Sequence, residues 1–298
     1  MTVLVTGARG QVGRAVLQQL HAAGRPVRAA SARPAELAVP AGVPRVELVL
    51  NRPDTFAAAL AGVRQVFLYP EPAGVDAFVA AAEAAGVEHV VLLSSASVLA
   101  PDAESDPLGA HNLAVERALT ASGLSATLLR ADAFASNALG WARPIGAGLP
   151  VELPYPEAHL APIHPADIAD VAVAALTDDA PTGTTPTGTT PTNATRPGLR
   201  GRAVTLTGGQ SLTLRAQVGV LAEVLGREVP VRTISRAEAE RQLSRFMPAP
   251  MVGSLLSYWS AATAGPATVG DTTRSLLGTP ERTFHQWAVE NAAAFSAN

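Results

Sequence analysis

Residues 6 to 13 of the chain read Thr6-Gly7-Ala8-Arg9-Gly10-Gln11-Val12-Gly13. They follow an apolar, strand-like run at Thr2–Thr6 and open a helical run at Gln11–Ala23. At such a turn Gly7 permits the tight bend, Gly10 lets the backbone approach a ligand, and Gly13 lets the helix lie close to the strand. Free backbone amides and the helix dipole bind phosphate at the start of the helix. We therefore predict a dinucleotide site here rather than a glycine-rich turn without a ligand.

The end of the second expected strand indicates which dinucleotide binds. A site that prefers NAD usually carries an acid about 20 residues further on, but the first acid here is Glu36. Arg33 takes that place, and a guanidinium there would pair with a 2′-phosphate and stack on adenine. Ser31 adds a hydrogen-bond donor. We predict NADP(H), with NAD(H) as the alternative cofactor and a solvated surface arginine as the alternative role of Arg33.

The rest of the first half alternates short apolar runs with longer Ala/Leu-rich helical runs. The expected strands are Thr2–Thr6, Pro26–Ser31, Arg45–Leu50, Gln65–Tyr69, His89–Ser94 and Ala126–Arg130. The expected helices are Gln11–Ala23, Asp54–Ala61, Val75–Ala85 and Leu108–Ser122. Strands that are apolar throughout are covered on both faces, and this alternation gives a parallel sheet. A TIM barrel shares the alternation, but the glycine pattern favours an α/β, doubly wound parallel Rossmann sheet.

The second half is less regular, and the family resemblance that its motifs carry, given below, implies that it forms a smaller C-terminal α/β domain that binds the substrate. We expect a dinucleotide-binding domain over 1–150 and a mainly substrate-binding domain over 151–298. Within the latter, 161–177 and 203–207 should pack back on the first domain. The Thr/Pro/Gly-rich segment 181–201 offers little to bury, which predicts a disordered insertion.

Composition excludes several kinds of chemistry. The 298 residues carry a net charge of −3 and no cysteine, which excludes disulfides, thiolate metal sites and thiol nucleophiles. The chain contains arginine but no lysine, which excludes Schiff-base chemistry and a Tyr-x-x-x-Lys pair. The scattered histidines predict no metal site. We expect a cytoplasmic protein that binds a small molecule but neither nucleic acid nor membrane, and whose sequence leaves a homodimer open.

Several short motifs occur in a familiar order along nearly the whole chain. They are Thr6–Gly13, Leu92-Leu93-Ser94-Ser95, the stretch 122–130 (SGLSATLLR), Phe134 to Asn137, the stretch 163–169 (IHPADIA) and Leu206-Thr207-Gly208. Together they resemble the NmrA-like family of atypical short-chain dehydrogenase/reductases, which are NAD(P)-binding Rossmann proteins. The resemblance implies a Rossmann domain with a smaller domain that forms a substrate cleft. Its members include NAD(P)H-dependent reductases, tailoring enzymes and sensors that bind the dinucleotide without turnover, so the reaction does not follow from the family.

The candidate cofactor ligands combine the glycine loop with polar residues at strand ends. They are Thr6, Gly7, Arg9, Gly10, Gln11, Val12, Gly13, Ser31, Arg33, Asn51, Tyr69 and Ser94. Asn51 stands where many relatives have an aspartate near the adenine. The candidate substrate residues are Ser95, Phe134, Asn137, Trp141 and His164, although capping of the following helix is the favoured role of His164.

The usual proton relay of short-chain dehydrogenases is missing. Where the resemblance places its tyrosine and lysine, this chain has His111 and Val115. The candidate catalytic residues are therefore His111, Ser94 and Tyr69, each with a structural role as its alternative. We expect an NADPH-dependent oxidoreductase for a conjugated or quinone-like molecule, because delocalised charge lessens the need for a strong acid. The alternatives are a non-catalytic redox sensor and a non-redox tailoring enzyme.

Overall fold

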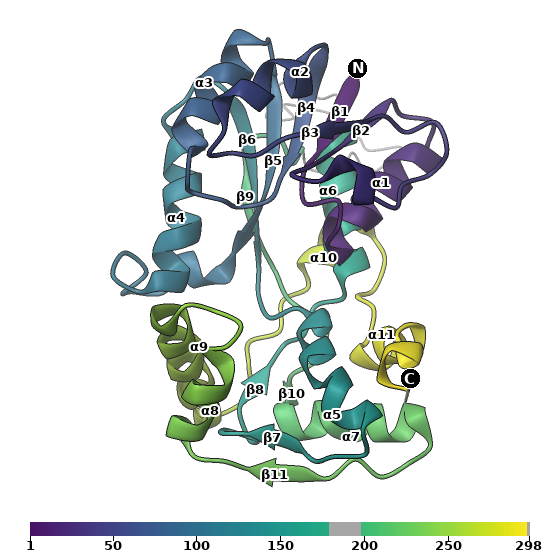
Figure 1. The fold of residues 1–298 in the computed structure, drawn as a ribbon, viewed down its shortest axis with the longest axis vertical. Helices are drawn as coiled ribbons and strands as arrows, with labels where there is room; N and C mark the ends of the chain where they lie inside the picture. Colours follow the sequence, from purple (N-terminus) through teal and green to yellow (C-terminus); the bar gives the residue numbers. More distant parts are fainter. Residues whose placement is uncertain (179–197, 297–298) are drawn as a thin grey trace, which may run out of the picture.

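A computed structural model of the chain describes residues 1–178 and 198–296. Its centre is a sheet of seven parallel strands in the order β3-β2-β1-β4-β5-β6-β9 (Figure 1). Their bounds are β1 Thr2–Val5, β2 Val27–Ser31, β3 Arg45–Glu47, β4 Val63–Leu68, β5 His89–Ser95, β6 Ser125–Ala131 and β9 Ala203–Leu206. The strand order reverses between β1 and β4, which is the switch point where ligands bind in doubly wound sheets.

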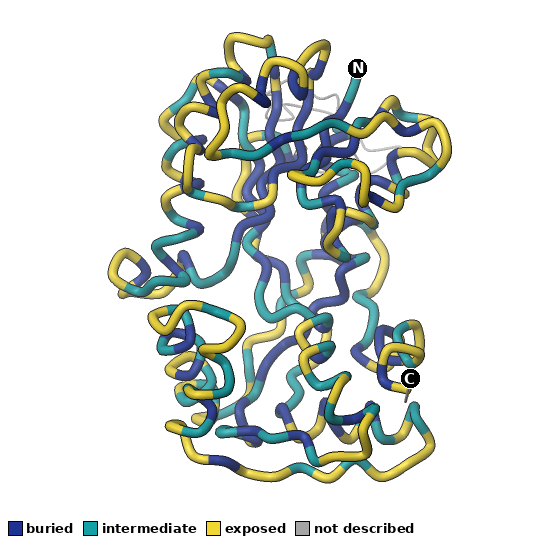
Figure 2. The backbone as a smooth tube through the Cα atoms, in the orientation of Figure 1, coloured by how far each residue is buried: buried dark blue, intermediate teal, exposed yellow. Residues whose placement is uncertain are grey.

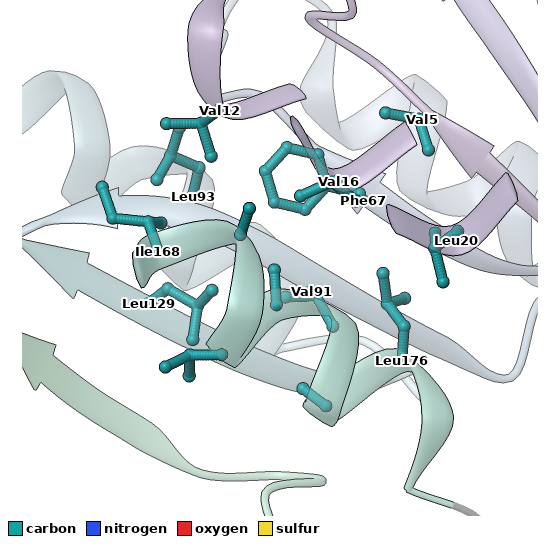
Figure 3. Close-up of a cluster of buried hydrophobic side chains, with 14 of the residues drawn as sticks. Val5, Val12, Val16, Leu20, Phe67, Val91, Leu93, Leu129, Ile168 and Leu176 are labelled. Carbon is teal, nitrogen blue, oxygen red and sulfur yellow. The ribbon is translucent and has the colours of Figure 1, made fainter. Parts of the chain in front are cut away.

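Helices cover both faces of this sheet. On one face lie α1 (Gln11–Ala22) and α6 (Pro165–Thr177), and on the other lie α2 (Phe56–Leu60), α3 (Val75–Ala84) and α4 (Pro107–Thr120). Figure 3 shows the first interface, where α1 and α6 pack their apolar side chains over Phe67, Val91 and Leu129 of the sheet. Because both faces are buried, the central strands contain almost no exposed position (Figure 2).

A second, smaller lobe lies beyond the carboxyl ends of the strands (Figure 1). It has two short strand pairs, β7 (Val151–Leu153) with β11 (Val231–Thr233) and β8 (His159–Leu160) with β10 (Leu212–Thr213). Its helices are α5 (Ala142–Gly146), α7 (Leu214–Leu225), α8 (Arg236–Leu243), α9 (Ala249–Ala261) and α11 (Phe284–Glu290). Its core centres on Trp287, which packs against Phe284 and Phe295.

Within residues 1–178 and 198–296, six short 3-10 helices and one further helix, which returns to the sheet, complete the fold. The 3-10 helices are η1 Pro34–Glu36, η2 Pro53–Thr55, η3 Ala96–Leu99, η4 Ala135–Trp141, η5 Ala262–Ala264 and η6 Ala292–Phe295. Helix α10 (Thr272–Leu277) packs on α6 and β9, away from the second lobe that precedes and follows it in sequence. The chain therefore crosses between the two lobes repeatedly, which ties them together.

The expected fold class, a doubly wound parallel Rossmann sheet, is confirmed. The division into domains stays a prediction, and the packing puts the change of core nearer residue 134 than residue 150, because Ala135, Ala138 and Ile145 are buried in the second lobe. Helix α6 and strand β9 belong to the sheet layer. The expected disordered insertion over 181–201 falls largely on 179–197, outside the described residues.

His89 at the start of β5 is fully buried and neutral. Its Nε2–H donates to Thr127 Oγ1 at 2.9 Å, because the Thr127 hydroxyl itself donates to the carbonyl of Leu199. Its Nδ1 has no hydrogen-bond partner. Burial lowers the pKa of His89 from 6.5 to about 4, since an imidazolium would be desolvated here.

The unfolding free energy should therefore fall as the pH drops from 6.5 to 4. In that window His89 takes up a proton in the unfolded chain but not in the folded chain. The unfolding free energy should therefore be about 3 kcal/mol lower at pH 4. Denaturant unfolding across this range measures the loss. In His89→Leu the unfolding free energy should change less steeply with pH. The remaining change includes a smaller contribution from His164, because burial also lowers the pKa of that residue. The control His285→Ala removes a half-exposed histidine and should keep the wild-type slope; an unchanged slope in His89→Leu contradicts the assignment.

Candidate functional site

The glycine loop joins β1 to α1 at the switch point and leaves the start of the helix uncapped. Gly7 has a φ of +62°, the left-handed conformation that favours glycine. A Cβ on Gly13 would lie 2.5 Å from the carbonyl oxygen of Gly7, so only glycine fits there. Gly10 is the N-cap residue and supplies no side-chain hydrogen bond to the helix amides. Those amides are therefore available to an anion, which the helix dipole also favours.

Thr6 and Tyr69 hold the two sides of this loop together. The Thr6 hydroxyl donates to the carbonyl of Phe67 at 3.1 Å and accepts from the backbone N–H of Tyr69 at 2.7 Å. The Tyr69 side chain packs on Gly7, where an added Cβ would lie 3.0 Å from Tyr69 Cβ and 3.2 Å from the ring. Tyr69 is nevertheless 54% exposed. It is thus packed on the loop and still partly exposed.

Two arginines meet beside the end of β2, where the adenosine half of a dinucleotide lies in this fold. Arg33 contacts Glu36 at 3.1 Å, and Arg9 of the glycine loop approaches the same carboxylate at 3.9 Å. Both guanidinium groups are more than half exposed, so the pairs contribute little to stability. The Ser31 hydroxyl accepts from the backbone N–H of Arg33 and shapes this turn. The local excess of positive charge suits a phosphate.

Other cofactor candidates occupy varied positions. Asn51 is exposed beside Gly74, whose φ of +81° and close approach to the Leu50 carbonyl fix that loop. The Val12 side chain is buried in the core, so only its backbone amide faces the loop. The Gln11 side chain reaches the second lobe, where it contacts the Asn291 amide and accepts from the Trp287 indole N–H, both at 3.4 Å.

Ser94 is placed beneath the site and not in it. It is 2% exposed, and its hydroxyl donates to Glu116 Oε1 at 2.5 Å. Glu116 is also buried and forms a two-pronged ion pair with Arg130, at 2.7 and 3.0 Å. This position does not suit the direct contact with cofactor or substrate that the sequence suggested. The Glu116–Arg130 pair was missed by sequence reasoning, although an arginine that ends an apolar strand requires a buried partner.

His111 lies at the carboxyl edge, beside the turn that follows β4. Its Nε2 lies 3.3 Å from the carbonyl oxygen of Pro70, which only accepts, so this nitrogen carries the hydrogen. The structure thus brings His111 close to Tyr69, as neighbours around one turn. Ser95 instead caps η3, where its hydroxyl accepts from the backbone N–H of Ser97.

The candidate substrate residues after β6 begin the second lobe. Phe134 is half-buried against the sheet core and forms a bridge with Ile163, Trp141 packs on the second core, and Asn137 is exposed. His164 is the N-cap of α6: its Nδ1 accepts from the Ala166 N–H and its Nε2 contacts Glu290 at 3.1 Å. Capping, the favoured role of His164, is what the structure shows, and both its ring nitrogens are engaged.

A tyrosine–carboxylate pair that the sequence did not reveal spans the two lobes. The Tyr258 hydroxyl donates to Asp132 Oδ1 at 2.9 Å. Tyr258 lies on α9, and Asp132 directly follows β6. Burial raises the pKa of both groups, and the hydrogen bond from Tyr258 only partly offsets this for Asp132. The two residues are 126 positions apart, so no local pattern could have joined them.

The loop fits the diphosphate of an NAD(P)H molecule, since it combines a left-handed glycine, a position that a Cβ would fill and an uncapped helix start. Comparisons with known proteins agree. Residues 7–179 match the model of the NAD(P)H-binding family, and the chain belongs to this family. The expected NAD(P)H-dependent oxidoreductase class is confirmed by two full-length relatives.

The two relatives are both reductases. The chain is 37% identical, over 99% of each chain, to the (4-alkanoyl-5-oxo-2,5-dihydrofuran-3-yl)methyl phosphate reductase of Streptomyces griseus. It is 30% identical, again over 99% of each chain, to the NAD(P)H azoreductase of Xenophilus azovorans.

Solved structures share the fold over nearly the whole chain. An NADPH-dependent quinone oxidoreductase from Escherichia coli, complexed with NADPH, superposes with a TM-score of 0.74 at 22% identity, covering 97% of this chain and 99% of that one. A mutant of NmrA superposes with a TM-score of 0.71 at 18% identity, covering 99% and 96%. These structures show that the chain has the fold that the resemblance to the NmrA-like family implied. In the described part of the chain, no helix has the length and apolar character needed to span a membrane.

Two glycine variants should separate packing from ligand binding. Gly13→Ala forces a Cβ against the Gly7 carbonyl, so it should destabilise the fold by roughly 1–3 kcal/mol and weaken NADP(H) binding. In Gly10→Ala the added Cβ lies 3.4 Å from that oxygen, an ordinary contact, so stability should hold while the phosphate is kept away. Thermal unfolding and titration calorimetry with NADPH measure both effects. Equal stability losses, or wild-type NADPH affinity in Gly10→Ala, would contradict this division.

Proposed function

We propose that this protein is an NADPH-dependent reductase of a small molecule with a conjugated double bond or quinone-like system. Its class, an NAD(P)H-dependent oxidoreductase, rests on the family and the two reductase relatives. The preference for NADPH rests on Arg33 and Arg9, which lie together where the 2′-phosphate would sit. A bound 2′-phosphate would take the place of Glu36 between the two guanidinium groups.

The chemistry of the relatives' substrates supports a conjugated acceptor. The name of the Streptomyces relative's substrate describes a ring double bond conjugated with two carbonyl groups, and that of the Xenophilus relative implies an azo bond. In each, a hydride adds to one atom while the negative charge spreads over neighbouring atoms. Such a reaction needs a weaker acid than reduction of a simple ketone, which fits a site with no Tyr/Lys pair.

The open edge above β4, β5 and β6 supplies the place for this reaction. Tyr69 covers the glycine loop at the phosphate end of the site, and His111, around the same turn, borders the space into which the nicotinamide would extend. When bound, NADPH supplies the hydride. The protein's part is to hold the cofactor by its phosphates, to position the acceptor against it and to provide a proton.

NADPH oxidation should proceed with acyl-butenolides or quinones and should be much slower with simple aliphatic ketones. The expected difference is about 100-fold or more in kcat/KM, because a ketone leaves its charge on one oxygen and depends on strong general-acid help. Absorbance of NADPH over a panel of acceptors measures it. NADPH binding without turnover of any acceptor would favour the sensor alternative, and no binding of either dinucleotide would exclude both.

Arg33→Ala should weaken NADPH binding about 10- to 100-fold and leave NADH binding nearly unchanged, because only NADPH carries the 2′-phosphate. Calorimetric titration with each dinucleotide measures the difference. Arg52→Ala is the matched control: it removes an exposed arginine that pairs with Glu47 and Asp54, on the next strand connection. Equal losses for both cofactors, or a loss in the control, would contradict the assignment.

A further inference from the structure

The hydrogen bond between Tyr258 and Asp132 is the interaction at the strand-end edge that no part of the proposed function yet uses. Asp132 directly follows β6, whose last residue pairs with Ser95 at the end of β5. Its backbone N–H donates to the carbonyl of Leu206 on β9, which fixes the main chain at this point. The carboxylate therefore lies at the carboxyl edge of the sheet, where ligands of open α/β sheets bind.

Tyr258 reaches this edge from the second lobe. It lies on α9, which packs beside α4, the helix that carries His111. Its hydroxyl is 2.9 Å from Asp132 Oδ1, and the residue remains 40% exposed. The phenol is thus oriented by a carboxylate, while part of the residue stays exposed.

We propose that Tyr258 is the proton donor to the reduced substrate and that Asp132 resupplies its proton. The proposal rests on the proposed function, since it assigns the acid of that reaction. In the step, hydride from NADPH forms a C–H bond, and the π electrons of the conjugated system move to the carbonyl oxygen. That oxygen takes the proton of the Tyr258 hydroxyl, the Tyr258 oxygen takes the proton of the Asp132 carboxyl group, and the Asp132 carboxylate regains a proton from water.

The properties of the two groups favour a relay over ionisation of the tyrosine. Burial raises the pKa of Asp132, which favours a carboxyl group that holds a proton to pass on. Burial also raises the pKa of Tyr258, so a free phenolate is disfavoured and its proton must be replaced as it leaves. As the Tyr258 hydroxyl turns its hydrogen from Asp132 to the substrate, the hydrogen bond between the two residues reverses, and the protonated Asp132 carboxyl group donates to the Tyr258 oxygen across the same 2.9 Å.

The other candidates at this edge are less suited to the task. The Nε2–H of His111 is directed at the carbonyl oxygen of Pro70, which already accepts it. The Ser94 hydroxyl is buried and directed at Glu116. Tyr69 packs on Gly7, at the phosphate end of the cofactor site.

Two variants test the relay with the full-length protein and an acyl-butenolide or quinone acceptor. Tyr258→Phe keeps the ring but removes the acid, and Asp132→Asn keeps an oxygen that accepts from Tyr258 but holds no acidic proton. Both should lower kcat about 100-fold, near the lower end of general-acid effects, with NADPH affinity within about 3-fold of wild type. Ser257→Ala, one position away on α9 and exposed, is the control and should keep the wild-type kcat.

The readouts separate the outcomes. Thermal unfolding checks that each variant folds, and NADPH titration checks the cofactor site independently of turnover. If Tyr258→Phe is folded, binds NADPH and turns over at the wild-type rate, the relay is overturned and the pair only joins the lobes. If Asp132→Asn alone keeps the wild-type kcat, proton supply by Asp132 is overturned. If the wild type itself reduces no acceptor, the proposed function fails, and the relay fails with it.

Discussion

The contact between the first turn of α1 and the end of β1 constrains everything built at the strand ends. Gly13 lies so close to the Gly7 carbonyl that no other residue fits, and Gly7 turns the chain in a conformation that other residues rarely adopt. This close approach aims the uncapped start of α1 at the switch point of the sheet. The phosphate site is therefore a property of backbone packing, and side chains only refine which dinucleotide it accepts.

Much of the fold was predictable because it depends on local pattern. Apolar runs that are buried on both faces predicted the strands of the main sheet. The second lobe was harder, since its strands have only two or three residues and are stabilised by packing around Trp287. After α11 the chain bends into η6, and Phe295 packs in that core against Trp287.

The candidate site was predictable only where it is made of backbone. The glycine loop and the arginine after β2 could be located from spacing, whereas the hydrogen bonds of Ser94, His111 and Asp132 depend on partners from other elements. Ser94 illustrates the limit. Its position at a strand end was correctly inferred, but a buried carboxylate of α4 draws its hydroxyl inward to complete a network with Arg130.

The contact of Gln11 with Trp287 gives the molecule a built-in optical signal. The indole N–H of Trp287 donates to the first side chain of α1, within a core from which water is excluded. Tryptophan emission depends on the hydrogen bonding and polarity around the indole. An anion bound at the start of α1 would change the charge and the side-chain positions next to Gln11. The wavelength or intensity of the intrinsic tryptophan fluorescence should therefore differ between the free and the bound protein.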